Sequence, residues 1–226
     1  MNQLFFEFHQ QSIYNIFYNK NFVITSENAD CEQRLAIFLQ QKTNNYKSNL
    51  LIIKGPTHSG KTHLINYLIE KISIKNFEYV DFSMVDEYNI GSFFIKNHFY
   101  IIENYHRITN YKLLLHFINM ASEVGAFLIF TANGNFNSSL PDLQSRLVSA
   151  INCEIEELSP FSAKLILINE MSFEQLKINQ SVVNFIANKT NINYQKLADI
   201  IKFIKYFYQE NSKAPKLEDI KNIIKS

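Results

Sequence analysis

Hydrophobic positions along this chain form short continuous runs that alternate with longer stretches of helical spacing. Five runs have the length and apolar character of buried strands: Leu50–Ile53, Phe77–Phe82, Phe99–Ile102, Ala126–Thr131 and, more weakly, Ile151–Glu156. Helical spacing from Leu64 to Ile72 and from Tyr111 to Glu123 predicts amphipathic helices between them. Strands that alternate with helices imply right-handed crossovers and a mostly parallel sheet covered on both faces, an α/β fold.

The pattern becomes wholly helical near residue 158. Ser159 before a proline predicts a helix start, and Ser172 with Gln175 has the spacing of a capping box. Asn193 precedes a long apolar stripe with helical spacing, and Leu217–Lys225 forms a last short helix. The expected organisation is an N-terminal segment (1–12), an α/β core (13–158) and a small all-α lid (159–226).

Composition and charge narrow the functional classes. The 226 residues are 46% hydrophobic, which excludes a disordered chain. Their 22 basic and 21 acidic side chains give a formal charge of +1, which offers no general argument for nucleic-acid or membrane binding. Cys31 and Cys153 have no metal or redox spacing, and the six histidines show no ligand spacing. Without a leader-like N-terminus or a membrane span, we expect a cytoplasmic protein.

One segment matches the phosphate-loop pattern G-x-x-x-x-G-K-[ST] in full: Gly55, Pro56, Thr57, His58, Ser59, Gly60, Lys61 and Thr62. Glycines allow successive backbone N–H groups to curl around phosphate oxygens. Lys61 can reach the β- and γ-phosphates, and the Thr62 hydroxyl can ligate Mg²⁺. An apolar strand before the loop and a helix after it supply the required context. The sequence therefore predicts binding of ATP or ADP with Mg²⁺.

The second half of such a site is an acidic residue that closes a later strand and holds the Mg²⁺ shell. Glu103 closes the run Phe99–Ile102, and Asn104 follows it. An amide can orient a water molecule but cannot accept its proton. Nucleotide binding is therefore expected to be intact, while hydrolysis in the chain's own site is expected to be weak. The alternative is that Glu103 is only a carboxylate at a strand end.

Three segments carry a family resemblance: Gly60-Lys-Thr-His63-Leu64, Ile102-Glu-Asn-Tyr-His106 and Leu140-Pro-Asp-Leu-Gln-Ser-Arg146-Leu147. They resemble the AAA+ domain of the bacterial DnaA replication initiators, and more closely the shorter regulatory branch of that family, Hda. The resemblance spans nearly the whole chain and implies a P-loop AAA+ core followed by a helical lid. Initiators carry a DNA-binding domain after the lid. The sequence ends at Ser226, so we expect no such domain here, which favours the regulatory branch.

The resemblance also implies nucleotide contacts. Phe22 and Val23 would lie against the adenine, and Gly55 to His63 would surround the phosphates. Asn133 occupies the sensor 1 position, where the family usually has Asp. Gln195 occupies the sensor 2 position, where the family has an arginine whose fixed charge contacts the phosphates.

By the same resemblance, Arg146 would be an arginine finger that acts in trans on a neighbouring protein's nucleotide. Arginine is scarce in this lysine-rich chain, and the other two are Arg34 and Arg107. A planar guanidinium cannot be imitated by lysine, which fits such a role. The alternative is a surface arginine paired with Asp142, four residues earlier on the same helix.

The N-terminal hexapeptide Gln3-Leu4-Phe5-Phe6-Glu7-Phe8 resembles the segment by which the regulatory branch, Hda, docks on the DNA polymerase sliding clamp. Gln3 would hydrogen-bond a pocket, while Leu4, Phe6 and Phe8 would fill apolar slots. The alternative is an edge strand that packs on the chain's own core.

Together these features predict an ATP- or ADP-binding regulator of replication initiation with at most a weak ATPase activity of its own. Its expected partners are the sliding clamp and the initiator DnaA, with self-association left open and no sequence-specific DNA binding. One alternative is a P-loop enzyme such as a small-molecule kinase, although residues 159–226 lack the arginines that clamp a transferring phosphoryl group. Another is an initiator-like or helicase-loader-like AAA+ protein that binds single-stranded DNA.

Overall fold

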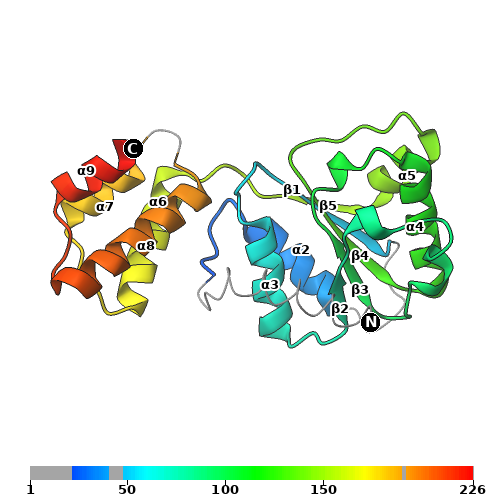
Figure 1. The fold of residues 1–226 in the computed structure, drawn as a ribbon, viewed down its shortest axis with the longest axis horizontal. Coiled ribbons are helices and arrows are strands. Elements are labelled where there is room, and N and C mark those ends of the chain that lie inside the picture. The colour runs from blue at the N-terminus through cyan, green and yellow to red at the C-terminus, as the bar shows by residue number, and fades with distance from the viewer. Residues whose placement is uncertain (1–21, 41–47, 190–191, 226) are drawn as a thin grey trace. The chain divides into compact units, whose positions relative to one another are not determined.

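The computed structural model describes residues 22–40, 48–189 and 192–225 (Figure 1). They divide into two compact units. The first unit contains Phe22 and the described parts of 30–56 and 61–155. The second contains 23–29, 57–60 and the described parts of 156–225.

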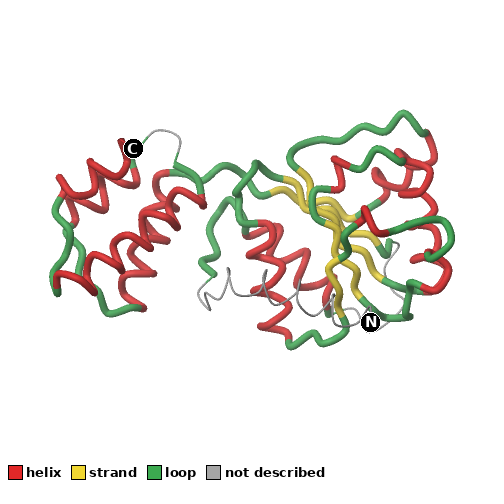
Figure 2. Tube along the Cα trace, viewed as in Figure 1, coloured by secondary structure: helices red, strands yellow, loops and turns green. Residues whose placement is uncertain are grey.

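A five-stranded parallel sheet forms the centre of the first unit (Figure 2). Its order is β2-β3-β4-β1-β5, and every neighbouring pair is parallel. Strand β1 thus lies between β4 and β5, and because all neighbouring pairs are parallel, the carboxyl ends of β1, β3 and β4 share one edge. Ligands of open parallel sheets bind at this edge, where the strand order reverses. The strands are β1 (Leu50–Lys54), β2 (Phe77–Tyr79), β3 (Phe99–Ile102), β4 (Phe127–Ala132) and β5 (Ile151–Glu154).

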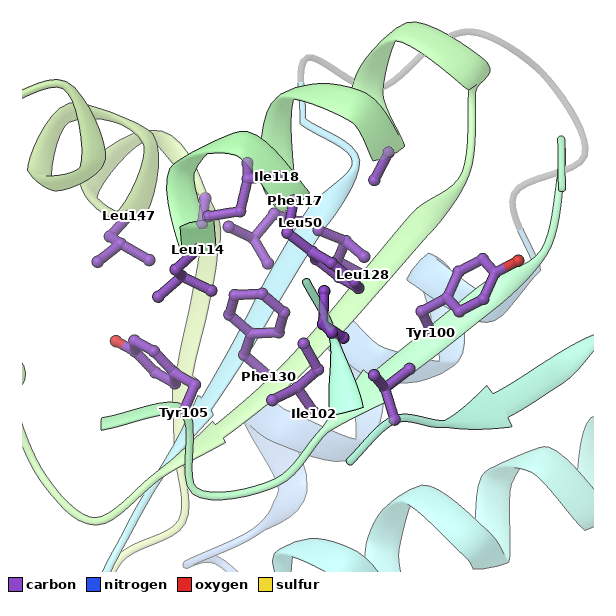
Figure 3. Close-up of a cluster of buried hydrophobic side chains, with 14 of the residues drawn as sticks. Leu50, Tyr100, Ile102, Tyr105, Leu114, Phe117, Ile118, Leu128, Phe130 and Leu147 are labelled. Carbon is purple, nitrogen blue, oxygen red and sulfur yellow. The ribbon is translucent and has the colours of Figure 1, made fainter. Parts of the chain in front are cut away.

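Helices cover both faces of the sheet, which confirms the α/β prediction (Figures 1 and 2). Helices α2 (Ala29–Leu39) and α3 (Lys61–Ile72) lie on one face, where Phe38 packs its ring edge against Phe99 and Phe127. Helices α4 (Tyr111–Val124) and α5 (Pro141–Ser149) lie on the other. There, every second side chain of the strands points toward the apolar face of α4 and packs against it, as Figure 3 shows. That core includes Leu50, Ile52, Tyr100, Ile102, Leu114, Phe117, Ile118, Leu128, Phe130 and Leu147.

Four helices with their own apolar core form most of the second unit: α6 (Pro160–Phe173), α7 (Gln180–Ala187), α8 (Tyr194–Asn211) and α9 (Leu217–Lys225). The predicted caps are present, because the side chains of Ser159 and Asn193 accept hydrogen bonds from the backbones of Ser162 and Lys196. None of the helices within the described ranges is sufficiently long and apolar to span a membrane.

The structure corrects three details of the sequence analysis. Strand β2 ends at Tyr79 rather than Phe82, because Asp81 caps a short 3-10 turn, η1 (Phe82–Met84), by accepting from the Ser83 backbone. Ser172 does not begin a helix. It lies in the last turn of α6, and the next helix begins at Gln180 after an Asn179 cap. Helix α2 was not predicted at all.

A buried carboxylate joins segment 23–29 to the start of α6 inside the second unit. Glu27 is 7% exposed and accepts hydrogen bonds from the Ser159 backbone (3.3 Å) and the Ser162 hydroxyl (2.7 Å). Burial alone would raise the pKa of Glu27. Hydrogen bonds from Ser159 and Ser162 outweigh it and lower the pKa from 4.5 to about 2.

Replacing Glu27 with Gln should therefore reduce stability in a pH-dependent way. The ionised carboxylate stabilises the fold above pH 4.5, and this contribution is lost as the pH falls toward 2. A shift of this size corresponds to roughly 3 kcal/mol near neutral pH. Urea unfolding should show a larger cost of E27Q at pH 7 than at pH 3, with E210Q on exposed Glu210 as control. Equal costs at both pH values would refute the assigned role.

Candidate functional site

The loop between β1 and α3 has a backbone that favours glycine at two positions. Gly55 has φ 151° and Gly60 has φ 90°, values that residues with a side chain rarely adopt. His58, with φ 61°, adopts the left-handed conformation without being glycine. Helix α3 begins at Lys61, directly after the loop, so the positive end of its dipole faces the loop. This arrangement is suited to an anion.

Lys61 is the first residue of α3 and is only 8% exposed. Its Nζ donates to the carbonyl oxygens of Gly55 (2.9 Å) and Pro56 (2.7 Å) and to Oδ1 of Asn133 (3.1 Å). Burial lowers the pKa of Lys61, and the nearby carboxylate of Glu103 acts in the opposite direction. The lysine therefore links the phosphate loop to the end of β4, directly before Asn133.

Thr62 and Glu103 form the second contact across this edge. Glu103 directly follows β3, and its Oε1 accepts a hydrogen bond from the Thr62 hydroxyl. A hydroxyl and a carboxylate are both oxygen ligands of the kind that Mg²⁺ prefers. Across the residues that the structure describes, no three His, Cys, Asp or Glu side chains gather to hold a metal by themselves. The pair fits a metal whose other ligands come from a bound phosphate and water.

Asn104 adopts a left-handed conformation, with φ 54° and ψ 40°. Its backbone N–H donates to the hydroxyl of Thr131 (3.0 Å), a residue of β4 that is 2% exposed. Asparagine tolerates this conformation better than most residues. Thr131 was missed by the sequence analysis, since nothing in its spacing distinguishes it from the other residues of a buried strand.

His106 was also missed as a site residue. Its Nδ1 accepts a hydrogen bond from the backbone N–H of Asn133 (3.4 Å). The sequence analysis considered it only as a metal ligand, and the motif Ile102 to His106 was the one signal that singled it out.

Arg146 lies exposed on α5. Within the described ranges its guanidinium forms no ion pair with Asp142, so the structure does not support that alternative. Arg34, by contrast, pairs with Asp30 at 2.8 Å. The cationic end of Arg146 is thus available to another molecule.

The chain matches no protein-family profile and no curated protein sequence. Solved structures do resemble it. Domain III of the replication initiation protein DnaA from Thermotoga maritima has a TM-score of 0.71 and 18% identity, over 90% of this chain and 93% of that one. AMPPCP-bound DnaA from Aquifex aeolicus has a TM-score of 0.67 and 17% identity, over 84% of this chain and 65% of that one.

The Holliday junction branch migration motor RuvB from Thermotoga maritima has a TM-score of 0.68 and 16% identity, over 89% of this chain and 69% of that one. DnaA and RuvB are both AAA+ ATPases. This chain has the AAA+ fold. At these identities the likeness shows the fold alone.

The resemblance also implied nucleotide contacts for Phe22, Val23 and Gln195. The Phe22 ring stacks on the Tyr67 ring and forms an edge contact with the His63 ring, with a distance of 5.1 Å between ring centroids in each pair. The Val23 carbonyl accepts from the Asn28 side chain. Gln195 is exposed and donates to Asp199, one turn along α8. Gln3, Leu4, Phe6 and Phe8 lie outside the described residues.

Proposed function

We propose that this chain is an AAA+ regulator of replication initiation that binds ATP or ADP. The observation that carries the proposal is the convergence of Lys61, Thr62, Glu103 and Asn133 at one edge of the sheet, beside a complete phosphate loop. Backbone N–H groups of the loop and the start of α3 would bind the phosphates, with Phe22 and Val23 near the base. The fold shared with AMPPCP-bound DnaA supports an adenine nucleotide.

Mg²⁺ fits the same site. The Thr62 hydroxyl and the Glu103 carboxylate are the residues that would hold it, because they already share a hydrogen bond. When bound, the ion neutralises charge on the β- and γ-phosphates. Lys61 supplies a further fixed positive charge to those phosphates.

The regulatory part of the proposal rests on Arg146. Its exposure on α5 without an ion pair in the described part of the chain supports a role on a partner rather than within this fold. In this proposal the chain docks on the sliding clamp through Gln3, Leu4, Phe6 and Phe8. It then presents Arg146 to ATP bound by the initiator DnaA, which promotes hydrolysis there and limits re-initiation.

The chain's own nucleotide site acts in this proposal as a switch with little turnover, because Asn104 cannot accept a proton. Replacing Asn104 with Asp should raise intrinsic ATP hydrolysis about tenfold to a hundredfold, since a positioned general base contributes at least that much. Aspartate also tolerates the left-handed backbone, so the fold should be kept. Single-turnover hydrolysis of bound ATP measures the effect. N104G, which keeps the backbone but adds no carboxylate, should leave the rate unchanged, and an unchanged rate in N104D would contradict the explanation.

Titration of the purified protein with the sliding clamp, with and without ADP, tests the docking step. The expected result is micromolar or tighter binding that a Gln3→Ala, Leu4→Ala double variant abolishes. A higher affinity for the clamp in the presence of ADP would show that nucleotide binding and clamp docking are coupled. If the clamp does not bind at all, the hexapeptide is not a docking segment, and the proposal reduces to nucleotide binding by an AAA+ domain with another partner.

A further inference from the structure

The chain turns sharply after β3, and a buried ring fixes this turn. Residues Tyr105–Arg107 form a single 3-10 turn, η3. Tyr105 is 1% exposed, and its ring centroid lies 5.3 Å from that of Phe130 on β4 and 5.2 Å from that of Phe136 beyond β4. Burial raises its pKa to about 12, which keeps the ring neutral. The buried Tyr105 ring thus fixes the backbone of the turn that also carries His106.

Asn133, which His106 contacts, lies outside the helices and strands. Asn133 is the first residue after β4, whose last ladder pair joins Ala132 to Lys54. Gly134 follows with φ 77°, so the chain changes direction at once. A residue between the end of a strand and a glycine in this conformation has more backbone freedom than one inside the sheet.

We propose that His106 is a positioning residue for the nucleotide site: it holds the backbone of Asn133 so that the side-chain amide meets Lys61. The Nδ1 of His106 accepts the Asn133 N–H at 3.4 Å, while Oδ1 of the same asparagine accepts from Lys61 Nζ at 3.1 Å. The two bonds form a short chain from the turn after β3, through the end of β4, to the phosphate loop.

The charge state of His106 agrees with this role. Burial lowers its pKa, and the positive charges of Arg107 and Lys61 lower it further. The imidazole therefore stays neutral at physiological pH, with the proton on Nε2 and Nδ1 free to accept.

The inference deepens the proposed nucleotide site and depends on it. Two variants separate positioning from general stability. His106→Leu removes the acceptor, whereas His106→Asn retains one, because the asparagine Oδ1 is attached where the histidine Nδ1 is. His116→Leu on the exposed face of α4 is the matched control for removing an imidazole. Binding of the fluorescent probe mant-ADP and hydrogen exchange of the peptide that contains Asn133 are measured for each, together with the thermal midpoint.

H106L should bind mant-ADP about threefold to tenfold more weakly, the range expected for one lost hydrogen bond. Exchange around Asn133 should also become faster. H106N should restore both properties to within about twofold of the wild type, and H116L should change neither. If H106L does not fold, H106A, which removes the acceptor and adds no larger apolar group, takes its place in the same comparison with H106N.

Two results would overturn the inference: mant-ADP affinity in folded H106L equal to wild type, or loss of affinity in H106N as large as in H106L. Failure of the wild type to bind mant-ADP is a different outcome, because it contradicts the proposed nucleotide site itself.

Discussion

Replacement of Lys61 with alanine is expected to weaken ATP and ADP binding by about a hundredfold or more. The lysine supplies charge-assisted hydrogen bonds, each of which contributes roughly 1.5 kcal/mol or more, and two of them correspond to a factor of about 100. Its Nζ now donates to the loop carbonyls of Gly55 and Pro56 and to Asn133. A bound phosphate would compete for the same donors, since an ammonium has only three.

Isothermal titration with ADP and with ATP in Mg²⁺ measures this effect. K112A is the matched control, because Lys112 lies exposed on α4 and should leave affinity unchanged. A K61A protein that binds either nucleotide within about threefold of wild type would show that the loop does not hold the phosphates.

Replacement of Arg146 with alanine is expected to remove the chain's stimulation of initiator ATP hydrolysis. Arginine fingers supplied in trans to GTPases accelerate hydrolysis by about 10³ to 10⁵, so a loss of at least about a hundredfold is expected here. R146K should not restore the activity, because lysine lacks the planar fork that stabilises transferring phosphoryl groups. Binding of ADP to the chain's own site should be unaffected, since Arg146 lies on α5 and not in the phosphate loop.

The assay is the single-turnover conversion of initiator-bound ATP to ADP in the presence of the clamp. R34A is the control, because Arg34 is an exposed arginine already paired with Asp30 on α2. If R146A stimulates hydrolysis as well as wild type does, the finger is elsewhere or the regulatory proposal is wrong.

Periodicity was sufficient to predict the α/β fold, since each strand is a short apolar run and each of the predicted helices carries an apolar stripe. The phosphate-loop pattern identified Lys61 and Thr62, and the expectation that an acidic residue closes a later strand of such a site pointed to Glu103. The structure brings these three residues and Asn133 together. Helix α2 was not predicted from the sequence. Strand β2 is shorter than the apolar run that predicted it, because the side chain of Asp81 caps a 3-10 turn there.

The site residues that were missed act through backbone atoms distant in sequence. Thr131 accepts from the backbone of Asn104, and His106 accepts from that of Asn133, each across 27 positions. Neither contact produces a recognisable residue spacing in the sequence, because the order of the strands in the sheet decides which residues become neighbours. Conversely, Ser172 and Gln175 have the spacing of a capping box but do not begin a helix. Ser172 lies in the last turn of α6, and Gln175 follows the end of α6 with a left-handed φ of 56°.

If the chain's own nucleotide is a switch, the chain binds ATP and hardly hydrolyses it. The most direct test incubates the purified wild-type protein alone with radiolabelled Mg-ATP and follows bound ATP and ADP over time. We predict stoichiometric binding with turnover well below one per minute, against a median of about 10 per second for enzymes. Rapid multiple turnovers, or no bound nucleotide, would contradict the account.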